Sequence, residues 1–265
     1  MNYATKDQQD RWLKPLLSGE IRSSYAMTEP QVASSDATNV EMSIVKEGNE
    51  WVLNGRKWFI TGAMNERTRI LIVMGKSDPS NPNRHLQQTQ VLVPKDTTGL
   101  TLVRPLTTFG YDDAPIGHAE LVFENCRVPL ENVLLGEGRG FEIAQGRLGP
   151  GRMHHCMRLI GTGQRSLELA CQRTVSRTTF GRQLSKHQSV REDISRMFSE
   201  IEMARLLVLK TCHQIDDQGV SASIDMIAAT KTTVPVLMQS VIDRAIQMHG
   251  AGGLTEDYCM AEGYN

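Results

Sequence analysis

The sequence predicts an α+β fold, in which an antiparallel, barrel-like β domain is followed by an antiparallel helical bundle. Between about residues 41 and 124, short β-branched runs alternate apolar and polar residues, and no helical pattern separates them. After Gly140, apolar residues recur every three or four positions over long stretches. Strands without intervening helices favour antiparallel pairing, and long amphipathic stretches favour a bundle.

The first element is an amphipathic helix over residues 6–20, which is interrupted by Pro15 and ends near Gly19. Hairpin turns are expected at Gly48-Asn49 and at Asn54-Gly55. A polar loop with two prolines is expected over residues 75–88. The strand-like runs cover residues 41–61, 69–74, 89–94, 100–105 and 118–125.

Three long helices follow. The first carries an apolar stripe through Ile160, and Gly181 is expected to cap its C-terminal end. The second covers about residues 194–208. The third covers about residues 224–246, and Pro235 is expected to kink or break it.

Composition limits the classes of function. A chain of 265 residues, 40% of them hydrophobic, can bury a substantial core. The 29 Lys and Arg nearly balance the 30 Asp and Glu, which leaves a net charge of -1, so no overall electrostatic field attracts nucleic acid or an anionic membrane. An anionic ligand would have to be bound by a local group of basic residues. No run approaches the roughly 18 apolar residues of a membrane span, and no secretory signal is readable. Five cysteines without a C-x-x-C pair favour a reducing, intracellular compartment and no disulfides.

Two motifs in the β region each have a structural and a functional interpretation. The stretch MTEPQVASSDATN (27–39) is rich in hydroxyls and carboxylates, which form turns or contact a ligand at the edge of a sheet. The stretch RKWFITGA (56–63) is either a core strand with an ordinary exit turn, or an aromatic wall for a flat ring to which Thr61 donates a hydrogen bond.

Two motifs in the helical region are similarly ambiguous. The stretch RTTFGRQ (177–183) either complements a helix dipole or presents the Arg177 guanidinium to a diphosphate. The stretch AIQMHGAGG (245–253) is either a helix C-cap or a turn whose backbone approaches a ligand closely.

Two further motifs favour structural interpretations. GEGRGFE (136–142) contains G-x-G, but no βαβ unit surrounds it, so its glycines are expected to shape the crossing from sheet to bundle rather than to bind a nicotinamide. HHC (154–156) places adjacent side chains in different directions on a helix. No metal site is therefore expected there.

Taken in order, the motifs resemble those of the acyl-CoA dehydrogenase family over about residues 6–258. The matching segments are Y-A-M-T-E-P followed by S-S-D, K-W-F-I-T-G-A, G-R-G-F, G-P-G-R, R-x-x-F-G-R-Q and Q-x-H-G-A-G-G. The stretch QGRLGPGRMHHCMR most resembles the corresponding stretch in the branch of family members ten and eleven. The resemblance implies an FAD enzyme that oxidises an acyl-CoA to the trans-2-enoyl-CoA in fatty acid β-oxidation. The protein itself would position the substrate against the flavin and stabilise the negative charge that develops on the thioester enolate.

The resemblance also implies roles for single residues. Contacts to the flavin ring are expected from Tyr25, Met27, Thr28, Phe59 and Thr61. The FAD of a neighbouring subunit is expected to meet Arg177, Phe180, Gln188, Gln247, Gly250 and Ala251. Substrate contacts are expected from Arg152 and from one of two serines, Ser34 or Ser35. The choice between the serines stays open, because this loop has one residue more than the family's common motif. The cofactor site would thus be shared across a dimer, within a dimer of dimers.

The resemblance implies a carboxylate as catalytic base, past the glycine-rich turn and therefore beyond Asn265. Some relatives use a second position, immediately before the arginine of the first long helix, but here that position is Gly151, which offers no proton acceptor. No catalytic residue is therefore found in the chain. Glu262 is a conceivable replacement, but its surroundings, CMAEGYN, are not expected to match the family. The expected domains are a remnant of an N-terminal helical domain (1–22), a middle β domain (23–135) and an incomplete C-terminal helical domain (136–265). A chain truncated at both ends is expected to be inactive alone.

Two alternatives remain: a non-catalytic flavin or acyl-CoA binder, which includes an isoform inserting into full-length oligomers, and a purely structural scaffold. The family implies a mitochondrial or peroxisomal location, and electron transfer to an electron-transfer flavoprotein or to oxygen.

Overall fold

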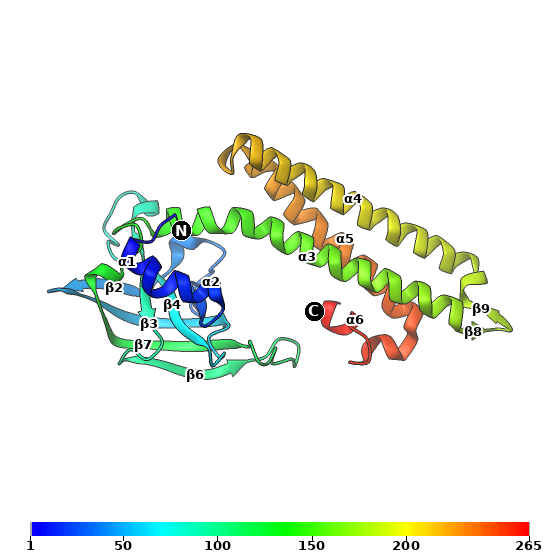
Figure 1. The fold of residues 1–265 in the computed structure, drawn as a ribbon, viewed down its shortest axis with the longest axis horizontal. Helices are drawn as coiled ribbons and strands as arrows, with labels where there is room; N and C mark the ends of the chain where they lie inside the picture. The colour runs from blue at the N-terminus through cyan, green and yellow to red at the C-terminus, as the bar shows by residue number, and fades with distance from the viewer. Residues whose placement is uncertain (1, 265) are drawn as a thin grey trace. The chain divides into compact units, whose positions relative to one another are not determined.

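The computed structural model describes residues 2–264, and the chain divides into two compact units between Gln145 and Gly146 (Figure 1). The first unit begins with helix α1 (Lys6–Gln8), a π-helical turn (Gln9–Leu13) and helix α2 (Lys14–Ser18). Thr5 caps this segment at its start, and Gly19, with a φ of 80°, ends it. The predicted helix over residues 6–20 is therefore confirmed, including its stop at Gly19, but the predicted interruption at Pro15 is wrong, because this residue lies in the first turn of α2.

One mixed sheet forms the body of the first unit. Its strand order is β1-β4-β2-β3-β7-β6, and β5 pairs with the other edge of β4. The bounds are β1 (Arg22–Ala26), β2 (Ser43–Glu47), β3 (Glu50–Thr61), β4 (Thr68–Lys76), β5 (Gln88–Pro94), β6 (Leu100–Leu106) and β7 (His118–Pro129). The predicted run over residues 41–61 contains both β2 and β3, each of the other runs coincides with one strand, and β1 was not predicted as a strand-like run. The α+β class is confirmed.

The sheet is not purely antiparallel, which corrects the prediction. Strand β1 pairs with β4 in parallel, and β2 meets β4 in parallel at Ser43 and Lys76. Parallel neighbours need a long crossover, usually a helix. Here the loop after β1 and the β2–β3 hairpin form the crossover instead, so the absence of a helical pattern did not exclude parallel pairing.

Only one of the two predicted hairpin turns forms. Glu47 pairs with Glu50, so Gly48 and Asn49 are the two turn residues of the β2–β3 hairpin. Strand β3 instead continues through Asn54 and Gly55. A Cβ at residue 55 would lie 2.9 Å from the Cγ of Met42, so this glycine serves close packing rather than a turn.

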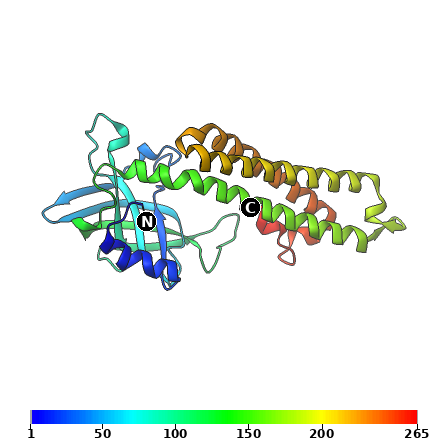
Figure 2. The same ribbon diagram turned by 45° about the horizontal axis from the view of Figure 1, so that its top comes forward.

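The main core of the first unit is formed by side chains of the sheet and includes Trp51, Leu53, Val73, Leu121 and Phe123, all at most 2% exposed. A second cluster packs the N-terminal helical segment, through Trp12 and Leu16, against buried residues of β4 and β5. Figures 1 and 2 show this segment lying against the sheet. The N-terminal helix is therefore part of the first compact unit.

The second unit is helical. Its elements are the greater part of α3 (Gly140–Ser176), α4 (Gln188–Gln218), α5 (Ile224–His249) and the short α6 (Met260–Tyr264). Helices α3, α4 and α5 lie side by side (Figures 1 and 2). They bury a shared core that includes Ile160, Met197, Ile201, Met238 and Val241. The three predicted long helices are therefore confirmed.

The predicted helix cap at Gly181 is wrong, and the break considered at Pro235 does not occur. Helix α3 ends at Ser176, and Gly181 lies in a small hairpin of β8 (Thr178–Thr179) and β9 (Arg182–Gln183). Phe180 and Gly181 have φ angles of 51° and 77°, as a type I′ hairpin turn requires. Helix α5 is not broken at Pro235, because the buried Val234 and Met238 hold the segment in the core.

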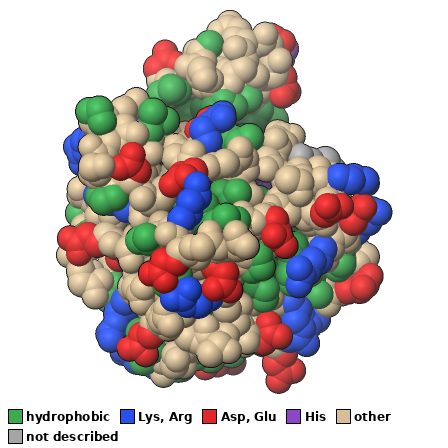
Figure 3. Space-filling model, turned by 90° about the vertical axis from the view of Figure 1, so that its left-hand side faces the viewer, with side chains coloured by type: hydrophobic (Ala, Val, Ile, Leu, Met, Phe, Trp, Pro, Cys, Tyr) green, Lys and Arg blue, Asp and Glu red, His purple; other side chains and the backbone are tan. Residues whose placement is uncertain are grey.

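The surface mixes charges of both signs, and Figure 3 shows acidic and basic side chains interspersed on the face that it draws. Among residues 2–264, no helix combines the length and the apolarity needed to cross a bilayer.

Candidate functional site

A buried ion pair fixes the loop that carries MTEPQVASSD. Lys57 on β3 is fully buried, and its Nζ donates to Glu29 Oε1 at 2.7 Å and to the carbonyl of Met27 at 2.8 Å. The carboxylate of Glu29, which is 3% exposed, also accepts the backbone N–H groups of Glu41 and Met42 at 2.7 and 3.1 Å. These four hydrogen bonds hold the loop in one conformation.

Burial dominates the electrostatics of this pair. Loss of solvent lowers the pKa of Lys57 from 10.5 to about 8, while the charge of Glu29 acts in the opposite direction. The ammonium therefore remains the main form at neutral pH, and the pair holds the loop as an ion pair.

The loop is also tied to the end of β3. The Thr28 hydroxyl donates to the carbonyl of Trp58 at 2.5 Å, and the Trp58 N–H donates to the carbonyl of Thr28 at 3.1 Å. The next residue, Phe59, has a φ of 49° at an irregularity in the β3–β7 pairing and is 42% exposed. An exposed aromatic residue in a left-handed conformation is strained, and such strain is typical of binding sites.

The predicted ring contacts from β1 are also close to this loop. Tyr25 is half-buried, and its hydroxyl accepts a hydrogen bond from Gln90 Nε2 at 2.9 Å. Met27 packs in a small cluster with Ala37, Met74 and Ala144, and Tyr25 lies against the same cluster. The structure thus places Tyr25 on β1, Met27 and Thr28 on the loop that follows β1, and Phe59 and Thr61 at the end of β3.

The two candidate serines differ in exposure. Ser34 Oγ accepts the N–H of Glu29 at 3.0 Å and donates to carbonyls within the loop. Ser35 is exposed to solvent. The hydroxyl of Ser34 is therefore used to shape the loop, whereas that of Ser35 is accessible to a ligand.

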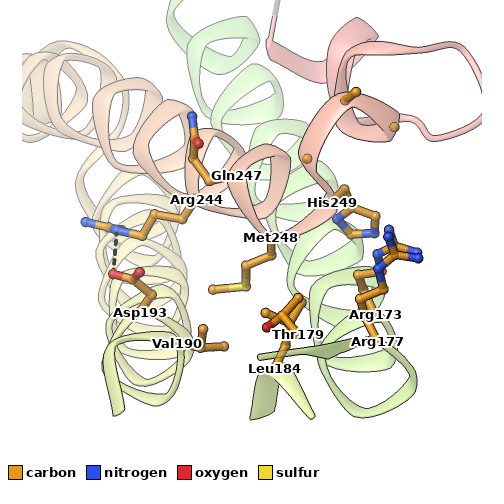
Figure 4. A pocket seen from close by; sticks show the side chains of 13 residues that line it. Arg173, Arg177, Thr179, Leu184, Val190, Asp193, Arg244, Gln247, Met248 and His249 are labelled. Atoms are coloured by element: carbon orange, nitrogen blue, oxygen red, sulfur yellow. Dashed lines mark ion pairs between the residues drawn. The ribbon is translucent and has the colours of Figure 1, made fainter. Parts of the chain in front are cut away.

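In the second unit, a cavity of about 550 Å³ gathers four of the predicted FAD contacts. Arg177 directly follows α3, and the end of α5 with its glycine turn contributes Gln247, Gly250 and Ala251 (Figure 4). Its full lining is Arg173, Arg177, Thr179, Leu184, Val190, Asp193, Arg244, Gln247, Met248, His249, Gly250, Ala251 and Gly252.

The arginines of this cavity are not equivalent. Arg244 is neutralised by Glu200, at 2.6 Å, and lies 3.8 Å from Asp193. Arg173 and Arg177 form no ion pair with a carboxylate among residues 2–264, and the Nε of Arg173 is buried without a hydrogen-bond partner. Two guanidinium groups without a carboxylate partner, four residues apart in the chain, are suited to binding an anion.

The other predicted residues lie outside the lining of this cavity. Phe180 is 98% exposed at the tip of the hairpin, and Gln188 begins α4. Arg152 is half-buried within α3. Glu262 is on α6 and lines a separate cavity with His155, Arg158 and Arg165 on α3.

The glycines of GEGRGFE lie in closely packed surroundings. A Cβ at Gly138 would lie 2.9 Å from the carbonyl of Leu86, and one at Gly140 would lie 2.8 Å from the backbone of Gln88. These glycines therefore let the start of α3 and the segment before it pass closely beside Leu86 and the first residue of β5. Within the described part of the chain, no three His, Cys, Asp or Glu side chains gather in a group suited to a metal ion.

Sequence reasoning missed several residues of these sites. Lys57 lies on the same inward face of β3 as Leu53, and a lysine at an inward position was an available signal. Arg173 stands four residues before Arg177, which directly follows α3 and whose N–H donates to the carbonyl of Arg173 at 2.9 Å, so this spacing was an available signal. His249 is buried in the cavity wall, its ring against Tyr258 with centroids 4.6 Å apart; it belongs to the Q-x-H-G-A-G-G motif, but no role was predicted for it.

The cysteines give a prediction that is independent of any ligand. All five are free thiols; Cys126 and Cys156 are buried, and Cys259 is exposed. Burial raises the pKa of Cys126 to about 11 and also raises that of Cys156. We expect iodoacetamide to modify Cys259 first and these two only after unfolding, as measured by peptide mass spectrometry. Rapid labelling of Cys126 in the native chain would contradict its placement.

Comparison with known proteins is consistent with this arrangement. Family models of the acyl-CoA dehydrogenase middle domain and C-terminal domain match residues 24–126 and 138–265. The second match extends through CMAEGYN, so the expectation that these last residues depart from the family is wrong.

Curated relatives include mouse acyl-CoA dehydrogenase family member 10, with 53% identity over 99% of this chain and 24% of the relative. Chicken family member 11 has 50% identity over 98% of this chain and 34% of the relative. The chain thus spans about a third or less of the length of these relatives.

The solved structure of butyryl-CoA dehydrogenase from Megasphaera elsdenii covers 99% of this chain, and the chain covers 67% of that structure, with a TM-score of 0.87 and 28% identity. With two family models that together match most of its length, the chain belongs to the acyl-CoA dehydrogenase family.

Proposed function

We propose that this chain is part of an FAD-dependent acyl-CoA dehydrogenase that oxidises an acyl-CoA to the trans-2-enoyl-CoA in fatty acid oxidation. The observation that carries the proposal is the cavity of the second unit, where two unpaired arginines face a glycine-rich turn. Two unneutralised guanidinium groups held together in a near-neutral protein are suited to binding an anion.

The residues present fit FAD. The unpartnered Nε of Arg173 and the guanidinium of Arg177 suit the diphosphate, and Gly250 and Ala251 allow its close approach to the backbone. Tyr25, Met27, Thr28, Phe59 and Thr61 suit a flat ring, because they combine apolar surface with hydroxyl groups. The chemistry that FAD would supply is acceptance of a hydride from the acyl β-carbon.

The protein would contribute position. The buried pair of Glu29 and Lys57 holds the loop before any ligand binds, so little ordering is required at binding. Between the two candidate serines, we assign the contact with the CoA arm to Ser35, since the hydroxyl of Ser34 is used within the loop. Arg152 is proposed as a further substrate contact.

The assembly and the partners belong to the same proposal. The residues of the second unit would meet the FAD of a neighbouring subunit, in a dimer of dimers: Phe180 at the hairpin tip, Gln188 at the start of α4, and Arg177, Gln247, Gly250 and Ala251 in the cavity. The exposure of a whole phenylalanine ring supports a contact made only in an assembly. Electrons would pass to an electron-transfer flavoprotein or to oxygen, and the location would be mitochondrial or peroxisomal, which imaging of the tagged protein would test.

The experiment is a visible spectrum of the purified chain after addition of FAD and removal of free cofactor, followed by a long-chain acyl-CoA without oxygen. Bound flavin that bleaches would show that a base exists within these residues. Bound flavin that stays oxidised until the full-length protein is used would place the base outside the chain. Failure of both proteins to retain FAD would overturn the proposal.

A further inference from the structure

Beside the exposed ring of Phe59, three side chains form a hydrogen-bonded chain. The Thr61 hydroxyl lies 3.0 Å from Nδ1 of His118, and Nε2 of His118 lies 2.7 Å from Oδ2 of Asp113. The ring of His118 also lies near that of Phe59, with centroids 6.1 Å apart. We call Thr61, His118 and Asp113 the hydroxyl relay.

The backbone builds this relay. Thr61 and His118 are directly opposite each other at the ends of β3 and β7, and the Gly62 N–H donates to the carbonyl of Gly117 at 2.9 Å. Asp113 has a φ of 52°, and its carbonyl accepts the N–H of Gly117 at 2.8 Å. A left-handed turn thus returns the carboxylate to the imidazole, and the contact does not depend on flexible side chains alone.

The order of the groups fixes the direction of each hydrogen bond. A carboxylate only accepts, so the proton of a neutral His118 lies on Nε2. Nδ1 then has a lone pair and accepts the proton of Thr61. The single hydroxyl proton of Thr61 is then used in the bond to His118, and only the two lone pairs of its oxygen remain. Thr61 can therefore accept a hydrogen bond from a ligand but cannot donate one.

We infer that His118, oriented by Asp113, is a positioning residue that makes Thr61 a hydrogen-bond acceptor toward the bound flavin. This inference rests on the proposed function, and it reverses the direction of donation expected from the sequence. Reduced flavin has more ring N–H donors than oxidised flavin. An acceptor at Thr61 therefore favours binding of the reduced form, whereas a freely rotating hydroxyl also serves the oxidised form.

The first test needs no cofactor. Nitrogen-15 NMR of the imidazole groups, at mildly alkaline pH and assigned with the H118L variant, should show Nε2 protonated and Nδ1 unprotonated in His118. The T61V variant should shift the Nδ1 signal, and D113N should shift the tautomer balance. The matched control is the His213–Asp217 pair on α4, at 3.3 Å, where D217N should leave His118 unchanged. A protonated Nδ1 in the wild-type chain would overturn the inference.

The second test measures the affinities for oxidised and reduced FAD, whose ratio sets the midpoint potential. H118L should reduce the preference for the reduced form by about tenfold, the effect of one hydrogen bond, and H118L should have no further effect in a T61V background. H213L serves as the control. An unchanged potential in H118L would sink the inference although FAD binds, whereas a wild-type chain that retains no FAD would count against the proposed function and leave the NMR result to decide the relay.

Discussion

Replacing Lys57 by methionine should lower the free energy of unfolding of the β unit by about 3–5 kcal/mol, the usual cost of breaking a buried ion pair from one side. The methionine side chain fills similar space, so the loss is electrostatic rather than a cavity. It leaves the carboxylate of Glu29, which is 3% exposed, with only the two backbone donors at residues 41 and 42. Denaturant unfolding of the full chain, followed by tryptophan fluorescence, measures the change.

The same substitution at the surface provides the control. Lys6 pairs with Asp10 at 3.1 Å, but its side chain is 75% exposed, and Lys6→Met should change stability by about 0–1 kcal/mol. Glu29→Gln should also be destabilising, whereas the double variant E29Q/K57M should cost less than the two single costs added together. Strict additivity of the two variants would show that the pair is not coupled.

The pair also predicts a pH dependence. The pKa of Lys57 is about 8 in the folded chain, against 10.5 for an ordinary solvated lysine such as the unfolded chain presents, so the unfolded chain holds the proton more tightly between these values. Where the unfolded state binds more protons, stability rises with pH. The contribution of Lys57 to the free energy of unfolding should therefore increase from about pH 8 to 10.5. K57M should lack this increase and Lys6→Met should keep it; equal slopes would contradict the lowered pKa.

The sequence predicted the elements better than their pairing. Alternating runs such as the one ending at Thr61 define strands by local pattern, and long apolar stripes define helices. The parallel pairing of β1 with β4 depends on residues more than forty positions apart, which no local pattern records. The turn wrongly placed at Gly55 shows the same limit, because that glycine serves a distant side chain, Met42.

The candidate sites were predictable where a motif names its residues. The cavity unites Arg177 with Gln247 and Gly250, although seventy residues of chain separate the two motifs. The hydroxyl relay could not be read in advance, because the position of Asp113 depends on a left-handed loop conformation that the sequence does not specify. Lys57 is an intermediate case that the prediction missed: its inward position in β3 was readable from the pattern, whereas its partner, Glu29, was not.

Replacing Arg177 by glutamine should weaken FAD binding by about tenfold to a hundredfold, since a hydrogen bond to a charged group contributes about 1.5–3 kcal/mol. Arg173→Gln should act in the same direction, and the double variant R173Q/R177Q should lose less than the two effects combined, because both guanidinium groups would face one diphosphate. Arg177→Lys should recover part of the affinity, as it keeps the charge but not the fork. Equilibrium titration followed by flavin fluorescence gives each dissociation constant.

Three ligands separate an anion contact from a general loss of structure. FAD and ADP both have a diphosphate, whereas riboflavin has none, so R177Q should weaken the first two and leave riboflavin binding unchanged. The affinity for FAD should also depend less on salt in this variant, because fewer charges are screened. Arg196 is exposed on α4 outside the cavity lining, and Arg196→Gln should alter none of these values. If R177Q weakened riboflavin as much as FAD, Arg177 would be a structural residue, and the anion site would have to be assigned elsewhere.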